Sequence, residues 1–223
     1  MSSNGREILV VPRETLFSGN KYFEKGFVSV EEYDFGRVIN ENFRYLSRNP
    51  ELENNPSFKQ IIPYVWIYNP QEKKFLIYRR EKRQKENREF VEKRLHGKWS
   101  CGLGGHIDKG DDESNIIYDA MMRELKEEVF MEKYPSPRIV GYFNDDTKSK
   151  EKGKVLVGEV HFGVLAIAET TYAVLRQKED EVTEEKFLSA SELEDFLTSE
   201  GDNVETWTQV TWPAVKNYVL RKN

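Results

Sequence analysis

The apolar and polar positions of the chain follow two patterns, one before and one after the polar run at 49–57. Before it, the apolar run at 6–12 predicts a short strand, and apolar residues at helical spacing over 29–48 predict a helix. A Ser-x-x-Glu capping box that begins at Ser29 marks the predicted start of this helix. We therefore expect an N-terminal extension over 1–59, made of a strand and a helix.

After the polar run, the pattern becomes a mixture of strands and helices. Two runs rich in β-branched and aromatic residues, separated by a turn that contains proline, predict a β-hairpin. Strands and helices do not alternate regularly along the chain, so we expect an α+β fold rather than a doubly wound α/β fold. The predicted strands cover 60–69, 74–80, 138–144 and 154–169, and the predicted helices cover 114–129, the second half of 184–197 and the C-terminal end.

The helix predicted at 114–129 has one face that should be buried. Asp112 or Ser114 could cap its first turn, because both side chains accept hydrogen bonds from free backbone N–H groups. An apolar residue recurs at every fourth position, which is typical of a helix that packs one stripe against a core. That stripe consists of Ile117, Met121, Leu125 and Val129.

Three carboxylates project from one sector beside this stripe, because residues three and four apart are neighbours on a helix. They belong to Glu124, Glu127 and Glu128. Arg123 precedes Glu127 by four residues, where its guanidinium could brace a carboxylate. A solvated acidic flank is one interpretation. However, clustered anions near the C-terminal end of a helix oppose its macrodipole. Together with the glycine loop before the helix, they favour a bound cation such as magnesium, which prefers oxygen ligands.

The segment RELKEE at 123–128 and the loop GGHID at 104–108 resemble the Nudix box, the signature of the Nudix hydrolases. The resemblance implies a Nudix-type mixed β-sheet sandwiched between helices, formed by residues 60–223. It leaves 1–59 outside, as a cap or a dimer element. It also implies a hydrolase that depends on Mg²⁺ or Mn²⁺. The implied substrate is nucleoside diphosphate-linked and therefore contains a pyrophosphate.

The resemblance carries roles over to individual positions. It implies that Glu127 and Glu128 are metal ligands, and that Glu127 belongs to the catalytic group. The carbonyl of Gly105 would be a further ligand, and Glu124 would be a ligand or the base that activates water. Arg123 would orient the carboxylates. A metal ion at such a site neutralises phosphate charge and lowers the pKa of bound water.

Three departures from the box bear on activity. Asp111 stands where the family has its first glutamate, so it is a possible additional acid of shorter reach. The residues DDES at 111–114 form an insertion before the helix, and Phe130 replaces the glycine that follows the glutamate pair. The three glutamates remain, which favours a catalytic protein. The alternative is a catalytically inactive Nudix-like domain that binds or senses a nucleotide or a protein.

Other residues are weaker candidates for the site. His106 could contact the substrate, or it could be a loop residue bonded to the backbone. Arg79 and Arg80 begin a basic segment that could bind phosphates, although its interleaved glutamates make an exposed loop the better explanation. Glu181 could supply one further acid. Cys101 is expected to be a small buried apolar residue.

Composition narrows the possible partners. The chain has 34 basic and 39 acidic residues and a net charge of -5, so we expect no nucleic-acid partner. Its single cysteine excludes an intrachain disulfide framework and fits a reducing compartment. No apolar run approaches the ~20 residues that span a bilayer, so we expect a cytoplasmic protein with no membrane contact. The expected partner is a small-molecule diphosphate substrate, and the aromatic residues of the extension favour a homodimer.

Overall fold

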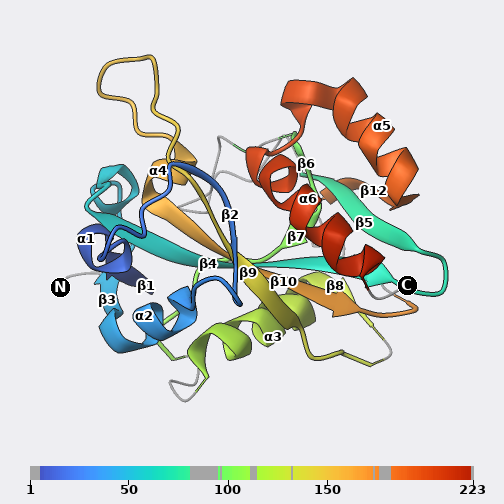
Figure 1. Cartoon of the computed structure of the whole chain (residues 1–223), viewed down its shortest axis with the longest axis horizontal. Coiled ribbons are helices and arrows are strands. Elements are labelled where there is room, and N and C mark those ends of the chain that lie inside the picture. Colours follow the sequence, from blue (N-terminus) through green and yellow to red (C-terminus); the bar gives the residue numbers. More distant parts are fainter. Residues whose placement is uncertain are drawn as a thin grey trace. The chain divides into compact units, whose positions relative to one another are not determined.

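The structure is a computed structural model that describes most of the chain, and Figure 1 shows its helices and strands. The chain divides into two compact units. Each unit is assembled from separate stretches of sequence. The first unit comprises Met1–Pro63, Gly105–Ala120 and Ile139–Leu165, and the second comprises Tyr64–Gly104, Met121–Arg138 and Ala166–Asn223. The described residues are 6–80, 95, 97–110, 115–131, 133–172, 174–175 and 182–221.

The elements of the first unit come mainly from the N-terminal part of the chain. They are β1 (Glu7–Pro12), α1 (Arg13–Leu16), β2 (Lys25–Ser29), α2 (Phe35–Asn42), β3 (Arg44–Ser47), the 3-10 helix η1 (Leu52–Asn54), most of β9 (Arg138–Asp145) and α4 (Val157–Val160). Four elements have residues in both units, namely β4 (Phe58–Asn69), α3 (Ile116–Glu128), β10 (His161–Glu169) and β9, of which only Arg138 belongs to the second unit.

The second unit contains the remaining described strands and the C-terminal helices. Its strands are β5 (Lys74–Arg80), β6 (Trp99–Ser100), β7 (Gly102–Leu103), β8 (Val129–Phe130), β11 (Val174–Leu175) and β12 (Val182–Ser189). Its helices are α5 (Ala190–Glu200), the 3-10 helix η3 (Gly201–Asn203) and α6 (Thr206–Leu220).

Most of the strand pairing is antiparallel. In the first unit, β1 pairs with β3 and β4, and β2 pairs with β9. In the second unit, β5 pairs with β12, β4 and β6, while β8 pairs with β11. This combination of antiparallel strands and helices confirms the predicted α+β class. Strands from within 1–59 pair with strands beyond residue 59, and the domain boundary placed there stays a prediction.

The helix predicted at 29–48 is wrong over most of its length. Ser29 ends strand β2, and its hydroxyl accepts from the backbone N–H of Glu32 (3.2 Å) in a turn. The helix α2 begins after Asp34, whose carboxylate accepts from the Arg37 N–H (3.2 Å). The residues after α2 form β3, because pairing with β1 overrides a spacing of apolar residues that also suits a helix.

Local signals located the other elements more accurately. The turn between β4 and β5 forms around Asn69, whose side-chain oxygen accepts from the N–H groups of Gln71 (3.0 Å) and Glu72 (3.1 Å). Helix α5 begins at a capping box formed by Ser189 and Glu192. The strand predicted at 154–169 is confirmed only in its second part, because its first part contains the short helix α4.

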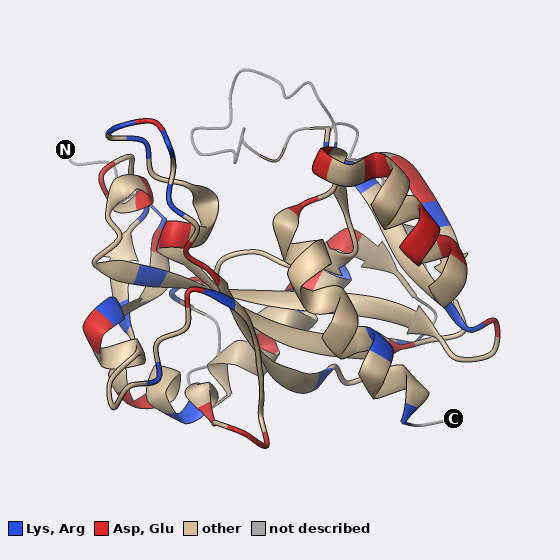
Figure 2. Ribbon diagram, turned by 45° about the horizontal axis from the view of Figure 1, so that its top comes forward, with Lys and Arg blue, Asp and Glu red and all other residues tan. Residues whose placement is uncertain are grey.

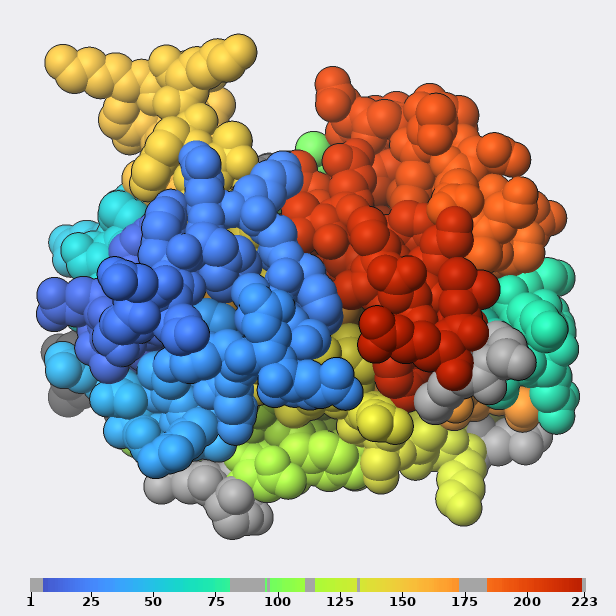
Figure 3. Space-filling view, in the orientation of Figure 1, coloured from blue at the N-terminus to red at the C-terminus, as the bar shows by residue number. Residues whose placement is uncertain are grey.

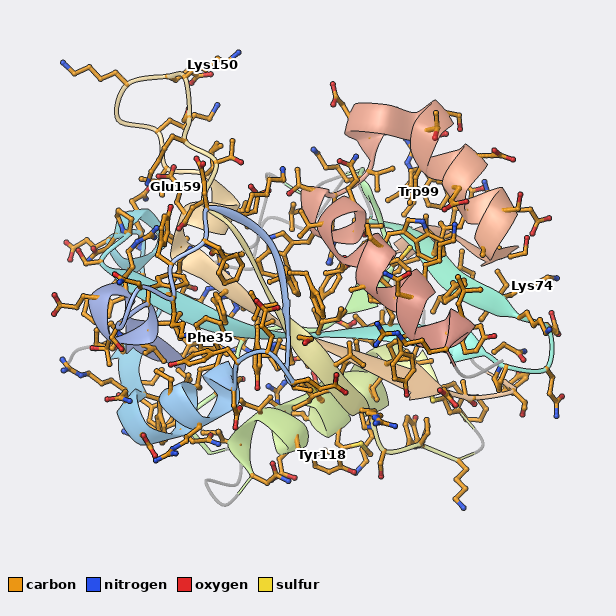
Figure 4. All side chains as sticks on the ribbon, in the orientation of Figure 1. Phe35, Lys74, Trp99, Tyr118, Lys150 and Glu159 are labelled. Atoms are coloured by element: carbon orange, nitrogen blue, oxygen red, sulfur yellow. The ribbon has the colours of Figure 1, made fainter. Side chains whose placement is uncertain are left out.

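Aromatic rings of the N-terminal extension pack inside the first unit. Phe35 is 1% exposed, and its ring lies 5.2 Å from that of Phe162 in β10 and 5.5 Å from that of Tyr142 in β9. Phe17 and Phe23 contact the same ring of Phe162. Figure 4 shows Phe35 among these side chains, and Figure 3 shows the N-terminal residues, in blue, over one face of this unit. These rings therefore have partners within the chain, and the homodimer stays a prediction.

Replacing Phe35 by alanine should test whether the extension belongs to the core. We expect Phe35→Ala to lower the free energy of unfolding by about 3–5 kcal/mol, because it leaves a cavity among packed rings. Phe130→Ala is the control, since that ring is 49% exposed, and it should cost less than about 1 kcal/mol. Chemical denaturation followed by circular dichroism gives both values. Equal small losses would show that the extension contributes little to the core.

A buried lysine lies at the centre of the first unit. The Lys59 ammonium is fully buried and donates to the side chains of Asp146 (2.6 Å) and Asn144 (2.9 Å). It also donates to the carbonyls of Gly158 (2.7 Å) and His161 (3.1 Å). Arg13 forms a second ion pair with Asp146, so that carboxylate lies between two cations. These contacts join β4, the end of β9, α4 and β10 into one hydrogen-bonded group.

The burial of Lys59 should make stability depend on pH. Burial lowers the pKa of Lys59 to about 8, although Asp146 opposes the shift. Between that value and the ordinary lysine pKa, the unfolded chain binds more protons, so the free energy of unfolding should rise with pH. Below pH 8 both states are protonated, and the contribution should be constant.

Denaturation at several pH values measures this effect. From about pH 8 to about pH 9.5, the wild type should gain on the order of 1–2 kcal/mol relative to Lys59→Met. Tyrosines with raised pKa are present in both proteins, so their contributions cancel in the difference. Lys154→Met, which removes an exposed lysine, should behave like the wild type. A difference between wild type and Lys59→Met that is independent of pH would contradict the assignment.

Charged residues of both signs are distributed over the ribbon in Figure 2. Helix α5 is the most acidic element and carries Glu192, Glu194, Asp195 and Glu200. Lys150 lies in the loop that projects beyond β9 and α4 (Figure 4). No helix among the described residues is long and apolar enough to cross a membrane.

Candidate active site

Helix α3 is fixed by its apolar stripe, as the spacing of its residues predicts. Each of the four stripe residues is at most 5% exposed, and the leucine and valine are fully buried. A helix held along one side cannot rotate about its axis, so the direction of its polar side chains is set by the same packing. The residues concerned are Ile117, Met121 and Leu125 in α3, and Val129, which directly follows the helix.

The three carboxylates of this helix differ in their surroundings. Glu124 is buried, at 6% exposed, and accepts a hydrogen bond from Arg123 Nη1 at 2.6 Å. The same guanidinium nitrogen lies 3.7 Å from Glu127, whose side chain is 47% exposed. Arg123 therefore binds mainly the neighbouring carboxylate and only weakly the one four residues later. Glu128 is half-buried.

Glu128 influences a buried tyrosine of the same unit. Burial raises the pKa of Tyr78, and the negative charges of Glu128 and Glu205 add to the shift while Arg80 opposes it. The Tyr78 hydroxyl is therefore neutral, and it donates to the carbonyl of Gly102 at 2.9 Å. Gly102 belongs to β7, which leads directly into the glycine loop.

The helix ends without the glycine that the Nudix box has after its glutamate pair. It stops at Glu128, and Val129 and Phe130 continue as β8, paired with β11. The Tyr134 hydroxyl donates to the carbonyl of Val129 at 2.8 Å, which satisfies a backbone acceptor at the helix end. The backbone of Phe130 is not left-handed.

His106, in the loop that follows the glycines, is held by side chains of the first unit. Its Nε2 lies 2.6 Å from the Gln60 side-chain oxygen and 3.3 Å from His161 Nε2. His161 Nδ1 donates to the Val157 carbonyl at 2.7 Å, so in the neutral ring His161 Nε2 is an acceptor. Burial holds the pKa of His106 well below its ordinary range, which keeps it neutral at pH 7. Gly105, which precedes it, is half-exposed.

Arg79 and Arg80, the predicted phosphate-binding arginines, make contacts within the second unit. Arg80 Nε lies 2.5 Å from the Glu205 carboxylate, which is almost fully buried. Arg79 Nε donates to the carbonyl of Gly97 (3.1 Å), and its guanidinium stacks 5.8 Å from the Trp99 ring centre. The positive charge of Arg80 is therefore largely balanced inside the unit. Their role in substrate binding stays a prediction.

A double-mutant cycle should measure how firmly Arg80 is tied to Glu205. For Arg80→Met with Glu205→Gln, we expect a coupling free energy of about 1–3 kcal/mol. This value is lower than for a fully buried ion pair, because the Arg80 side chain is 30% exposed. Lys186→Met with Glu184→Gln gives the matched control, an exposed pair at 2.9 Å that should couple by under about 0.5 kcal/mol. Similar couplings in both cycles would show that Arg80 keeps its charge available for a ligand.

Four of the predicted residues lie outside the part of the chain that the structure describes. They are Asp111, the possible helix caps Asp112 and Ser114, and the possible downstream acid Glu181. Cys101 is described and fully buried, which confirms its prediction as a small apolar residue. Burial also raises the pKa of its thiol well above the ordinary value.

The carboxylates of α3 have the chemistry that a hard divalent cation requires. Within the described ranges, no group of three or more His, Cys, Asp or Glu side chains is placed to hold a metal ion. Magnesium, however, usually keeps several waters and takes one or two protein carboxylates together with substrate phosphates. Glu127 and Glu128, which lie beside the Arg123–Glu124 pair and are not fully buried, fit that requirement.

Four polar residues hold other groups in place, and their partners were not predicted from the sequence. Gln60 and His161 hold His106, Glu205 holds Arg80, and Lys59 holds β10. Lys59 and Gln60 interrupt an otherwise apolar strand pattern, and a polar pair in a buried strand is a signal that could have indicated an internal network.

The family model of the NUDIX domain matches residues 59–208, more than half of the chain. With the RELKEE helix and the glycine loop in place, this match defines the class of protein. The chain belongs to the Nudix family. It is 31% identical over 211 residues to Protein YmaB of Bacillus subtilis (strain 168). The aligned residues make up 91% of this chain and 93% of that protein.

A solved structure supports the same classification. The crystal structure of Tm1382, a proposed Nudix hydrolase, has a TM-score of 0.71 and 25% identity, covering 95% of this chain and 99% of that one. The MutT protein from Methanosarcina mazei Go1 has a TM-score of 0.45 at 18% identity over 72% of this chain and 94% of that one, too low to support an argument. The chain is thus a Nudix-type pyrophosphohydrolase, an enzyme acting on phosphoric anhydride bonds.

Proposed function

We propose that this chain hydrolyses the pyrophosphate bond of a nucleoside diphosphate-linked substrate, and that it requires Mg²⁺ or Mn²⁺. The observation that carries the proposal is the arrangement on α3, where one buried carboxylate is bound by Arg123 and two further carboxylates remain accessible beside it. The family match supports a phosphoric anhydride as the bond that is broken.

The proposed roles follow from these surroundings. Glu127 and Glu128 would hold the metal ion, and the carbonyl of Gly105 would be a further ligand. When bound, a divalent metal would neutralise phosphate charge and activate a water molecule. Glu124 would be a ligand or accept the proton of the attacking water. Arg123 holds Glu124 in one orientation, which limits the geometries from which that carboxylate can act.

His106 is better suited to shaping the loop than to binding phosphate. A neutral imidazole bonded to Gln60 and close to His161 offers no positive charge to an anionic ligand. We propose that its ring anchors the backbone next to Gly105, and that any substrate contact it makes is secondary. Asp111 and Glu181 remain proposed additional acids.

Chromatography of the products formed from a panel of candidate substrates tests the proposal, because cleavage of a pyrophosphate bond in most of these compounds gives two phosphorylated products and no inorganic phosphate. The panel would include nucleoside di- and triphosphates, ADP-ribose, NADH and dinucleoside polyphosphates, each with and without Mg²⁺ or Mn²⁺. We expect turnover that requires the metal and falls by about 10²-fold or more in Glu127→Gln and Glu128→Gln, because each loses a charged oxygen ligand. Asp119→Asn, a change in the first turn of the same helix, should keep near wild-type activity.

Two results would contradict this function. Turnover that persists without divalent metal would remove the role of the carboxylates as ligands. No turnover across the panel, together with no stabilisation of the wild type by Mn²⁺, would favour a Nudix domain that only binds its ligand.

A further inference from the structure

The segment that follows Gly105 has little structure of its own. Gly110, at its far end, has φ of 122°, a conformation that residues with a side chain rarely adopt. Between these glycines the backbone forms neither a helix nor a strand of several residues, and bridge residues are present at Asp108 and Lys109. A segment bounded by glycines keeps one conformation only where other residues hold it.

Strand β1 of the N-terminal extension holds this segment through the backbone. The Leu9 N–H donates to the carbonyl of Ile107 at 2.8 Å. The Lys109 N–H donates to the carbonyl of Glu7 at 3.0 Å. Both bonds lie within the first unit, and they fix the backbone immediately after His106.

Side chains strengthen the same junction. Arg6 donates from Nε and Nη2 to the two carboxylate oxygens of Asp108, at 2.5 and 2.6 Å. This two-point contact fixes the orientation as well as the position of Asp108. Lys109 and Glu7 form a second ion pair at 2.8 Å. The carbonyl of Arg6 itself accepts from the N–H of Arg48 at 2.8 Å, so Arg6 is tied to the end of β3.

On its other side, the segment is held through His106. The contacts of that ring with Gln60 and His161 anchor the residue next to Gly105. The backbone of Gly105 is therefore followed directly by two anchors, the imidazole of His106 and the β1 junction at Ile107–Lys109. A carbonyl that is to face a metal ion in one fixed direction needs such support, because glycine supplies none.

We propose that residues 6–9 of the N-terminal extension position the Gly105 segment for metal binding, and that Arg6 is a positioning residue acting through Asp108. This inference rests on the proposed role of the Gly105 carbonyl as a metal ligand. It assigns the extension, which lies outside the matched NUDIX domain, a part in building the active site. Neither Arg6 nor Asp108 is proposed to touch the substrate.

Hydrogen–deuterium exchange on the full chain tests the mechanical part of this inference. In Arg6→Ala, the amides of Gly105–Lys109 should exchange about three- to tenfold faster than in the wild type. Arg37→Ala is the matched control, because Arg37 forms an ion pair with Glu41 at 2.8 Å on helix α2, in the same extension. It should leave exchange in this segment unchanged. Exchange that is equal in both variants and the wild type would overturn the inference.

Titration with Mn²⁺ alone, followed by electron paramagnetic resonance, tests the functional part. The relevant Mn²⁺ site is the one that Glu127→Gln removes. We expect its Kd to rise about three- to tenfold in Arg6→Ala. This effect is larger than that of losing an exposed ion pair and smaller than that of losing a direct partner of a metal ligand. Arg6→Lys should recover part of the affinity, and Arg37→Ala should match the wild type. The Lys109→Glu variant should bind more weakly, and adding Glu7→Lys should restore binding.

The outcomes separate the two proposals. If the wild type binds Mn²⁺ at a site that depends on Glu127 but Arg6→Ala binds equally well, the positioning role is wrong and the proposed function stands. If exchange is faster in Arg6→Ala without any change in Kd, the β1 contacts are structural only, and the inference is again overturned. If the wild type shows no Mn²⁺ site that Glu127→Gln removes, the proposed function fails, and the positioning of a metal ligand fails with it.

Discussion

A lysine ammonium inside a folded core must find acceptors for all of its N–H groups, and this requirement organises the first unit. Lys59 meets it with two side chains and two backbone carbonyls from β9, α4 and β10. One of those carbonyls belongs to His161, whose ring lies against His106. The position of His106, the residue beside Gly105, therefore depends on a buried charge through two successive contacts. Removing the charge would disturb the loop as well as the core.

The second unit is held together by different interactions. Its part of α3 is held by apolar packing, and the partly buried ion pair of Arg80 with Glu205 connects β5 to the start of α6. Apolar packing has no preferred direction, so helical geometry alone decides where Glu124, Glu127 and Glu128 project. The loop residues of the first unit, by contrast, are placed by directional hydrogen bonds. The carboxylates of the second unit are thus set by packing, and the glycine segment of the first unit is set by polar contacts.

Much of this could be predicted from the sequence where a local pattern decided the outcome. The stripe of α3, the hairpin turn at Asn69 and the cap at Ser189 each depend on neighbours in the chain. The helix expected at 29–48 failed because β3 forms only when β1 is beside it, a contact between distant residues. For the same reason the partners of His106 and Arg80 were not foreseen, since Gln60, His161 and Glu205 are far from them in sequence.

Phe130 shows how one departure from the Nudix box can be accommodated. A glycine after the glutamate pair would allow a left-handed residue that closes the helix. Here the chain passes directly into β8, whose pairing with β11 and whose contact with the Tyr134 hydroxyl provide partners for the backbone beyond Glu128. The Phe130 side chain, half-exposed, lies near the Tyr172 ring at 6.5 Å. The substitution therefore changes how the helix ends, while the spacing of its three carboxylates along α3 is the same as with glycine.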